Sequence, residues 1–349
     1  MASIKTEATE LSLAFGLLGI SDPLNVPQPR LNYLFEGTLS EQKYFEYSSS
    51  FQGELNLICK EMIDVGLDAR RNHPHIKNYP TLKWTGPSNI FITTALAKDI
   101  QIGLIAVSAK AKSDVVSNNS PFNIIEAYPS SNVSLQERSP NWYLEVSREE
   151  FQEYYQKFRE HCFPDQPESI EAFLKQTTKN ERKELVRRAV FLDEERKSSL
   201  NELYLRMCHS VAKESSLRFN ENMKRSMRGN SSQRIRVELV KAFFRISDSE
   251  YVLAGIDRGE KIALSFSNIS SLISDFELVE IIAEPDLNAG QAVVRFVVTI
   301  NSRKTNEIVN MPFHVELRWS HGKLCGNPEG KLYKDFAWKI LPFVNNLLV

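Results

Sequence analysis

The stretch from Ser88 to Asp114 constrains the fold of this chain most strongly. Two runs rich in β-branched and aliphatic residues, Asn89–Thr94 and Ile100–Ser108, are separated by a short polar turn at 97–99. Such runs, with Pro-Ser before them and charges after them, predict a buried β-hairpin. The second run leads into 108–112, Ser-Ala-Lys-Ala-Lys, where an apolar strand suddenly carries two cations. A lysine at the end of a buried strand is costly unless an anion meets it, so this end is a candidate site.

This layout resembles the nuclease core of the PD-(D/E)xK type. In that core an acidic residue opens one strand, and a second group two residues before a lysine closes the next. The resemblance implies that Asn89 stands at the first acidic position, Ser108 at the second and Lys110 at the lysine. Carboxylate and carbonyl oxygens would then hold Mg²⁺, which polarises the phosphate, while the lysine stabilises charge or positions the attacking water. A plain structural hairpin is the alternative, because buried hairpins with one lysine are common.

Asn89 departs from the expected pattern, because an amide oxygen ligates a metal without bringing negative charge. Three explanations stay open. A single Asp-to-Asn change has inactivated the chain, or the chain is a natural, degenerate DNA binder, or another acid supplies the charge. The candidates for that acid are Asp99, Asp114 and Glu126. Asp99 is expected at the turn far from Lys110, whereas the other two lie beyond the lysine and could fold back.

Composition and charge limit the classes of protein to which this chain can belong. Its 349 residues suffice for two domains, or for one large domain with an appendage. The 43 basic and 44 acidic residues give a net charge of −1, so no overall basic field points to nucleic acid. A local basic groove for DNA is still compatible with this balance.

The cysteines and the apolar segments indicate the cellular compartment of the protein. Four cysteines are scattered without Cys-x-x-Cys spacing, which argues against zinc and against a disulfide framework and is typical of a reducing cytoplasm. The first thirty residues lack a basic stretch followed by an uninterrupted apolar run, so we predict no signal peptide. No apolar run approaches about eighteen residues. We therefore expect a soluble, cytoplasmic protein.

The N-terminal part of the chain predicts an arm followed by a helix. Prolines at positions 23, 27 and 29 follow a short amphipathic patch, so residues 1–40 are interpreted as an arm. Apolar residues then recur at helical spacing from Glu41 to Val65. Glu46 lies in this helix, either as a solvated carboxylate or as an auxiliary acid that reaches a metal from the helix before the hairpin.

The segment Arg70–Trp84 interleaves cations with aromatic residues, a composition that suits contacts to a phosphate backbone or a base edge. Arg71 and His75 are the candidate DNA contacts, and a solvated loop is the alternative. A zinc site built on His73 and His75 is rejected, because no further ligand spacing supports it.

Residues 147–228 read as helix with few interruptions, and residues 231–349 read as β-rich. The alternating runs of the latter region are Arg234–Ile246, Tyr251–Ile256, Lys261–Phe266, Leu278–Ala283, Ala292–Ile300 and Glu307–Leu317. Within Phe313–Lys323 a strand then runs into Ser-His-Gly-Lys, and a Gly/Asn/Pro loop follows. A flexible loop of this kind suits a DNA groove. His321, Lys323 and Asn327 are its candidate contacts, and an ordinary polar turn is the alternative.

Together these pieces resemble the HaeIII-like type II restriction endonucleases. Five local features carry the likeness in order: the Phe45-Glu46-Tyr47 helix, the Ser88–Ile92 stretch, Ile102-Gly103-Leu104 followed by Ser-x-Lys, the charged helical middle with Trp142, and the C-terminal strand and loop. The likeness spans roughly residues 41–345, but only short stretches support it.

The resemblance implies an α/β fold with a restriction-endonuclease-like (PD-(D/E)xK) core, a mixed sheet flanked by helices, and a β-rich C-terminal region. The implied domains are an N-terminal arm over 1–40, a nuclease core with a helical insertion over 41–230, and a DNA-recognition region over 231–349. The implied activity is Mg²⁺-dependent hydrolysis of a short specific site in double-stranded DNA, paired with a cognate DNA methyltransferase. No membrane partner is expected.

The resemblance also implies roles for single residues. Asn89, the carbonyl of Ala109 and Glu46 would be metal ligands. Lys110 would contact the scissile phosphate or orient water, Ser108 would hold that arrangement, and Lys112 would contact another phosphate. The serine is compatible with this family, which also carries Ser-x-Lys at this point.

Two other classes of protein stay open. A non-catalytic, degenerate nuclease-fold protein that binds DNA or RNA, or a structural protein of a defence system, is favoured by the missing acid at position 89. The retained Ser-x-Lys favours the enzyme. The other class is an unrelated α/β enzyme. GxGxxG, Walker A, HExxH and GxSxG motifs are absent from the sequence, so mononucleotide-binding, metalloprotease and hydrolase functions have no support.

Overall fold

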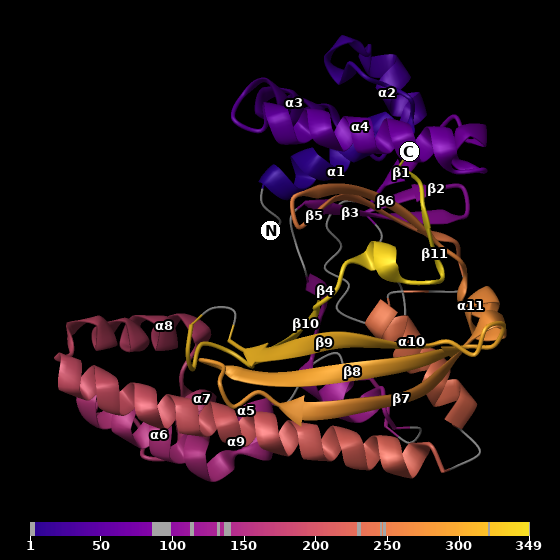
Figure 1. Cartoon of the computed structure of the whole chain (residues 1–349). Coiled ribbons are helices and arrows are strands. Elements are labelled where there is room, and N and C mark those ends of the chain that lie inside the picture. The colour runs from indigo at the N-terminus through magenta and orange to yellow at the C-terminus, as the bar shows by residue number, and fades with distance from the viewer. Residues whose placement is uncertain are drawn as a thin grey trace. The chain divides into compact units, whose positions relative to one another are not determined.

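A computed structural model describes residues 4–85, 99–111, 115–130, 133–135, 141–228, 232–244, 246, 249–319 and 322–348 (Figure 1). The fold is mixed α/β. Two compact units divide the chain: the first holds Met1–Asp114, Phe244–Glu277 and Phe336–Val349, and the second holds Val115–Phe243 and Leu278–Asp335. This division differs from the linear one expected from composition, because the chain leaves the first unit and returns to it twice.

The first unit contains a mixed sheet. Its strands, in spatial order, are β1 (Lys83–Trp84), β2 (Ile100–Ile102), β3 (Ile105–Ala111), β5 (Tyr251–Asp257), β6 (Glu260–Phe266) and β11 (Val344–Asn346). β3 and β5 run parallel, and the other neighbours run antiparallel. The short helices α11 (Ile269–Asp275), η2 (Ile76–Asn78) and η5 (Trp338–Ile340) complete this unit.

The expected strand Ile100–Ser108 is itself split into a hairpin. Ile100 pairs with Val107 and Ile102 pairs with Ile105, so the chain turns at Gly103 and the residue after it. Gly103 has a φ of +54°, a left-handed conformation that favours glycine. A Cβ at this position would also overlap the Tyr79 ring. The other predicted strand, Asn89–Thr94, lies outside the described residues.

Four helices gather on one side of this sheet (Figure 1). They are α1 (Ile4–Leu17), α2 (Gln28–Leu34), α3 (Glu41–Gln52) and α4 (Asn56–Asn72), and a 3₁₀ turn, η1 (Pro23–Asn25), joins the first two. The predicted helix Glu41–Val65 is thus two helices with a break at Gly53, which ends α3. On both sides of this break, the prediction that Glu41–Val65 is helical is confirmed.

Residues 1–40 are not an arm. Every residue of α1 from Ala8 to Leu17 is buried, and α1 contacts α4, α3 and β3. The prolines do not prevent regular structure, because Pro23 and Pro29 lie in the first turns of η1 and α2, where a missing N–H costs no helical hydrogen bond. Apolar residues of α1 therefore form part of the core of the first unit.

The second unit contains a five-stranded sheet covered by helices. Its strands, in spatial order, are β4 (Val115–Asn119), β10 (Glu329–Lys334), β9 (Ile308–Arg318), β8 (Ala292–Ser302) and β7 (Phe276–Pro285). Its helical elements are η3 (Asn123–Ala127), α5 (Trp142–Val146), α6 (Arg148–Cys162), α7 (Ile170–Gln176), α8 (Lys179–Arg187), η4 (Arg188–Phe191), α9 (Glu194–Ser226) and α10 (Ser232–Phe244). Phe219 of α9 and Phe243 of α10 pack edge-on against Phe296 of β8, which fixes the helices on the sheet.

The predicted helices of residues 147–228 and five of the six predicted strands of residues 231–349 are confirmed. The run Arg234–Ile246 is the exception, because it forms α10 instead of a strand. In a helix, Ile235, Leu239 and Phe243 share one face, and all three are buried. Their burial favours the helix over a strand.

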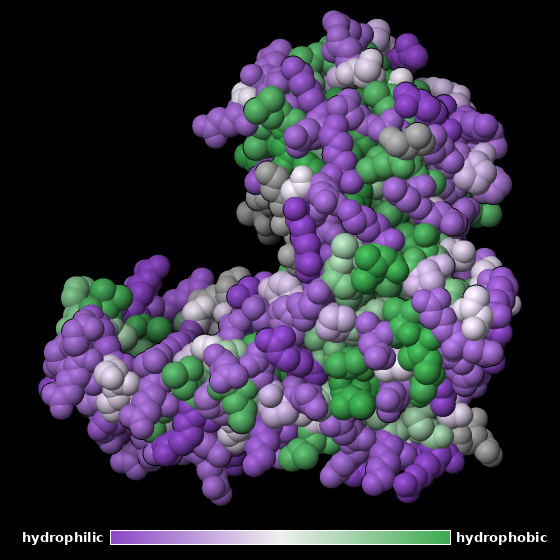
Figure 2. All heavy atoms as spheres, viewed as in Figure 1, coloured by the Kyte–Doolittle hydropathy of each residue, from purple (hydrophilic) through white to green (hydrophobic). Residues whose placement is uncertain are grey.

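Hydrophilic residues cover most of the surface visible in Figure 2, and hydrophobic side chains gather in a few places. In the second unit the most exposed of them are Val190 and Phe191 of η4. None of the helices in the described ranges is at once long enough and apolar enough to cross a membrane.

Candidate functional site

Asp99 lies beside the Ser-x-Lys end of β3. It directly precedes β2, its backbone N–H donates to the Val107 carbonyl at 3.0 Å, and its own carbonyl accepts from the Thr85 N–H at 3.0 Å. Its carboxylate oxygen Oδ2 accepts from the Ser108 hydroxyl at 3.0 Å and from the Ala109 N–H at 2.7 Å. The prediction that Asp99 occupies the far turn is therefore wrong: because the hairpin turns at Gly103, Asp99 is returned to the lysine end.

Lys110 follows on the same strand. Side chains two residues apart on a strand point to one face of the sheet, so Lys110 shares a face with Ser108. Lys110 pairs with Gly255 of β5, where a Cβ would overlap the Lys110 carbonyl. Glycine at position 255 therefore allows the two strands to approach.

The carbonyl of Ala109 points toward the Asp99 side of β3. The N–H and C=O of one strand residue point the same way, and those of the next residue point the opposite way. The Ala109 N–H binds Asp99, and the Lys110 carbonyl lies against β5. The carbonyl oxygen of Ala109, the predicted metal ligand, thus lies on the same side of the strand as the Asp99 carboxylate.

A second acid reaches this region from α1. Glu10 is only 4% exposed, and its Oε2 accepts a hydrogen bond of 3.0 Å from the indole Nε1–H of Trp84. Burial raises the pKa of Glu10 to about 8; the negative charge of Asp99 adds to this rise, and the Trp84 hydrogen bond opposes it. Two carboxyl groups from distant parts of the sequence thus act on each other inside the first unit.

Sequence reasoning missed Glu10 because residues 1–40 were interpreted as an arm. A signal was present: Glu10 lies in the middle of an otherwise apolar or small-residue helical stretch, from Ala8 to Leu17. An acid on a buried helix face is rarely tolerated without a partner, and such a position is a candidate functional residue.

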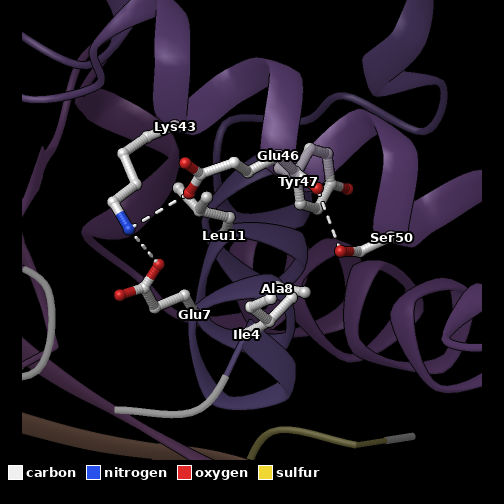
Figure 3. Close-up of a pocket in the computed structure, with 8 residues that line it drawn as sticks. All are labelled: Ile4, Glu7, Ala8, Leu11, Lys43, Glu46, Tyr47 and Ser50. Atoms are coloured by element: carbon white, nitrogen blue, oxygen red, sulfur yellow. Dashed lines mark hydrogen bonds and ion pairs between the residues drawn. The ribbon is translucent and has the colours of Figure 1, made fainter. Parts of the chain in front are cut away.

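The structure places Glu46 in a different cluster (Figure 3). The Lys43 ammonium lies 2.6 Å from Glu7 and 3.2 Å from Glu46, and Gln42 donates to Glu46 at 3.0 Å. These hydrogen bonds, from Gln42 first and then Lys43, lower the pKa of Glu46. The side chain is 39% exposed beside a shallow pocket that Ala8 also lines. Glu46 is thus a surface carboxylate of α3, and the structure does not bring it to Ser108 and Lys110.

The basic stretch before β1 divides into structural and exposed residues. The guanidinium of Arg70 donates to backbone carbonyls that include those of Leu17, at 2.9 Å, and Tyr79, at 3.4 Å, and so joins the end of α1 to this loop. Arg71 is exposed and pairs with Asp68 at 3.0 Å, and His75 is exposed as well. These two predicted DNA contacts lie on the surface of the first unit.

In the second unit, Lys323 turns toward aromatic side chains. Its ammonium lies 3.5 Å from the centre of the Tyr204 ring and 5.9 Å from that of Tyr154, and burial lowers its pKa. Asn327, by contrast, is exposed. Of these two predicted loop contacts, Lys323 is half-buried against aromatic rings and Asn327 is exposed.

The remaining candidates divide into two groups. Glu126, in the second unit, accepts from Asn222 at 2.6 Å and pairs with Arg218 at 3.4 Å, so its carboxylate has protein partners. Asn89, Lys112, Asp114 and His321 lie outside the described residues.

The donor atoms near Asp99 suit a hard divalent cation. They are two carboxyl groups, from Asp99 and Glu10, and one carbonyl, from Ala109, and oxygen ligands of this kind are those that Mg²⁺ prefers. A cation would offset the repulsion between the buried Glu10 carboxyl group and the half-buried Asp99 carboxylate. Within the described ranges no three His, Cys, Asp or Glu side chains form a metal-binding group by themselves, so a carbonyl or water would have to complete the set.

Comparison of the chain with protein-family models, curated proteins and solved structures finds no match.

Proposed function

We propose that this chain is a Mg²⁺-dependent nuclease that hydrolyses phosphodiester bonds in double-stranded DNA. One observation carries the proposal: Asp99 directly precedes β2 and binds Ser108, which stands two residues before Lys110 near the end of β3. This order of acid, second group and lysine is the one expected of a PD-(D/E)xK core. In the proposal, Asp99 takes the role first assigned to Asn89, and Glu10 that assigned to Glu46.

Asp99, Glu10 and the Ala109 carbonyl would hold the cation. Bound Mg²⁺ supplies Lewis acidity, which polarises a phosphoryl oxygen and lowers the pKa of coordinated water. The Ser108 hydroxyl and the Ala109 N–H fix the orientation of the Asp99 carboxylate, because both donate to Oδ2. The Lys110 ammonium, on the same face as Ser108, would stabilise negative charge on the scissile phosphate.

The finer proposal is a type II restriction endonuclease of the HaeIII-like kind, which cuts a short specific site and is paired with a DNA methyltransferase. In support, the second unit presents Asn327 on a Gly/Pro loop that is suited to base or phosphate contacts. A second candidate function is non-catalytic DNA binding. It is favoured by Ser108 in the place of a second carboxylate, which lowers the negative charge available for a metal.

Digestion of a long, unmethylated duplex DNA with Mg²⁺ tests the proposal. The wild-type protein should give discrete fragments, and Asp99→Asn or Lys110→Ala should lower the rate by at least about 100-fold, more than the loss of an outer-shell partner causes. Glu46→Gln is the matched control and should cleave like the wild type, because its carboxylate lies in the Lys43 cluster.

Asn89→Asp distinguishes the two assignments of the first acid. Unchanged cleavage by this variant agrees with Asp99 as the acid, whereas activity that appears only with Asn89→Asp would show that Asp99 has been misassigned. No cleavage by any variant, together with salt-sensitive duplex binding by all of them, would leave the non-catalytic DNA-binding protein.

A further inference from the structure

We propose that Trp84 is a positioning residue that holds the Glu10 carboxyl group beside Asp99 in a state ready for a divalent cation. This inference rests on the proposed function. It assigns a role to a residue that no sequence motif marks.

The position of Trp84 follows from the register of the sheet. Trp84 of β1 pairs with Ile100 of β2, the residue next to Asp99. The following residue, Thr85, donates its N–H to the Asp99 carbonyl at 3.0 Å. β1 and the residue after it thus contact both acids: the Thr85 N–H binds the Asp99 backbone, and the Trp84 indole binds the Glu10 carboxyl group at 3.0 Å.

The acceptor of the Trp84 indole N–H differs from the acceptors of two other buried tryptophans. Two other buried tryptophans donate to neutral groups: Trp142 to the Ser215 hydroxyl at 2.9 Å, and Trp319 to the Gly326 carbonyl at 2.9 Å. A buried indole N–H needs only some acceptor, and a neutral one avoids the cost of burying a carboxyl group. Trp84 instead donates to an acid that is only 4% exposed and whose pKa the negative charge of Asp99 helps to raise.

Glu10 depends on this one donor. Among the described residues, Trp84 alone donates a hydrogen bond to its carboxyl group. The bond occupies Oε2, whereas Oε1 accepts no hydrogen bond from any residue in the described ranges. Outer-shell donors of this kind orient metal-binding carboxylates, and their removal typically lowers metal affinity by about 10- to 100-fold. Trp84 therefore acts through Glu10, without contact to the substrate.

Mn²⁺ binding to the full-length protein without DNA tests the assignment. Free Mn²⁺ is counted by its electron paramagnetic resonance signal during titration of the wild type, Trp84→Phe, Asp99→Asn and Trp338→Phe. Trp84→Phe keeps an aromatic ring but removes the donor, so its dissociation constant for Mn²⁺ should rise by about 10-fold.

Trp338→Phe is the control in the same unit: Trp338 is also buried but packs against Phe266 and Phe336. It should bind Mn²⁺ like the wild type. Equal thermal unfolding of the two Trp→Phe variants would show that both fold.

A spectroscopic measurement separates positioning from packing. In protein labelled with 5-fluorotryptophan, the ¹⁹F signal that Trp84→Phe removes identifies Trp84 among the four tryptophans of the chain. Substoichiometric Mn²⁺ should broaden that signal first, because paramagnetic broadening falls steeply with distance.

The outcomes distinguish this inference from the proposed function. If Asp99→Asn loses Mn²⁺ binding but Trp84→Phe binds like the wild type, or if Mn²⁺ broadens all four signals equally, the role of Trp84 is refuted and the metal site stands. If the wild type binds no Mn²⁺, both fail.

Discussion

At the scale of single residues, the environment of a side chain decides its chemistry more than its type does. Glu10 and Glu46 are both helical glutamates of the first unit. Burial raises the pKa of Glu10, whereas hydrogen bonds from Gln42 and Lys43 lower that of Glu46. Only the first lies beside another acid that is fixed by the strand carrying Lys110. The same comparison applies to Arg70, which binds backbone carbonyls, and Arg71, which is exposed.

His73 gives a prediction at this scale. The imidazole is fully buried; its Nδ1 accepts the N–H groups of His75 and Ile76, at 3.2 and 3.4 Å, and its Nε2 lies 3.2 Å from Glu250. Burial lowers the pKa of His73 below its usual 6.5; the Glu250 carboxylate opposes this shift, and the His75 ring adds to it. The folded state thus favours the neutral ring. Stability is fully present above about pH 6.5 and falls as the pH drops through the lower, folded-state pKa.

Urea unfolding between pH 5 and pH 8 measures this effect. The wild type should lose about 1.4 kcal/mol for each unit by which the folded-state pKa is lowered. His73→Asn, whose side-chain oxygen can accept the same N–H groups, should show a flatter dependence on pH. Identical pH profiles for the two proteins would count against His73 as the titrating group.

At the scale of elements, the first unit depends on the close crossing of α1 and α4. Gly16 of α1 faces Gly66 of α4, and a Cβ on Gly66 would lie 2.8 Å from the Gly16 Cα and 2.5 Å from the Leu13 carbonyl oxygen. Both neighbours are backbone atoms, which cannot move aside as a side chain can. The crossing matters for the candidate site, because α1 carries Glu10 and contacts β3.

Gly66→Ala tests this crossing. Alanine favours a helix by up to about 1 kcal/mol over glycine, but overpacking against backbone typically costs about 1–3 kcal/mol. We expect a net loss of about 1 kcal/mol in the free energy of unfolding, measured with denaturant. Gly290→Ala is the control, since a Cβ there meets nothing within 4 Å, and it should change stability by less than about 0.5 kcal/mol. A stabilised Gly66→Ala protein would contradict the close crossing.

At the scale of the whole molecule, the first unit is assembled from three separate segments. Its sheet joins β3, from the N-terminal segment, to β5, from the middle one, and β6 to β11, near the C-terminus. The core of this unit extends from Ala8 to Leu347. None of the three segments contains this whole core by itself.

Deletion of residues 1–20, which removes α1, should therefore unfold the first unit instead of trimming an arm. Limited proteolysis should then cut within 21–85 more readily than in the intact chain, and the circular dichroism of the folded protein should decrease. Deletion of residues 1–3 alone is the control and should leave the protease pattern unchanged. A truncated protein that keeps the native pattern would restore the interpretation of this segment as an arm.

The sequence alone predicts the local elements of this protein well. The strand that ends in Ser108-Ala109-Lys110, the helices of residues 147–228 and most C-terminal strands follow from the spacing of apolar residues over a few positions. Such patterns fail where short-range spacing is ambiguous, as in α10, or where one glycine makes a turn, as at Gly103.

Only the tertiary structure decided which acids meet. Glu10 and Asp99 are separated by almost ninety positions, and their proximity depends on the packing of α1 on the sheet and on the register of β2 with β3. A change of register by one residue would turn the Asp99 side chain to the other face. Local periodicity carries no information about this register or this packing, because both follow from burial of the whole core.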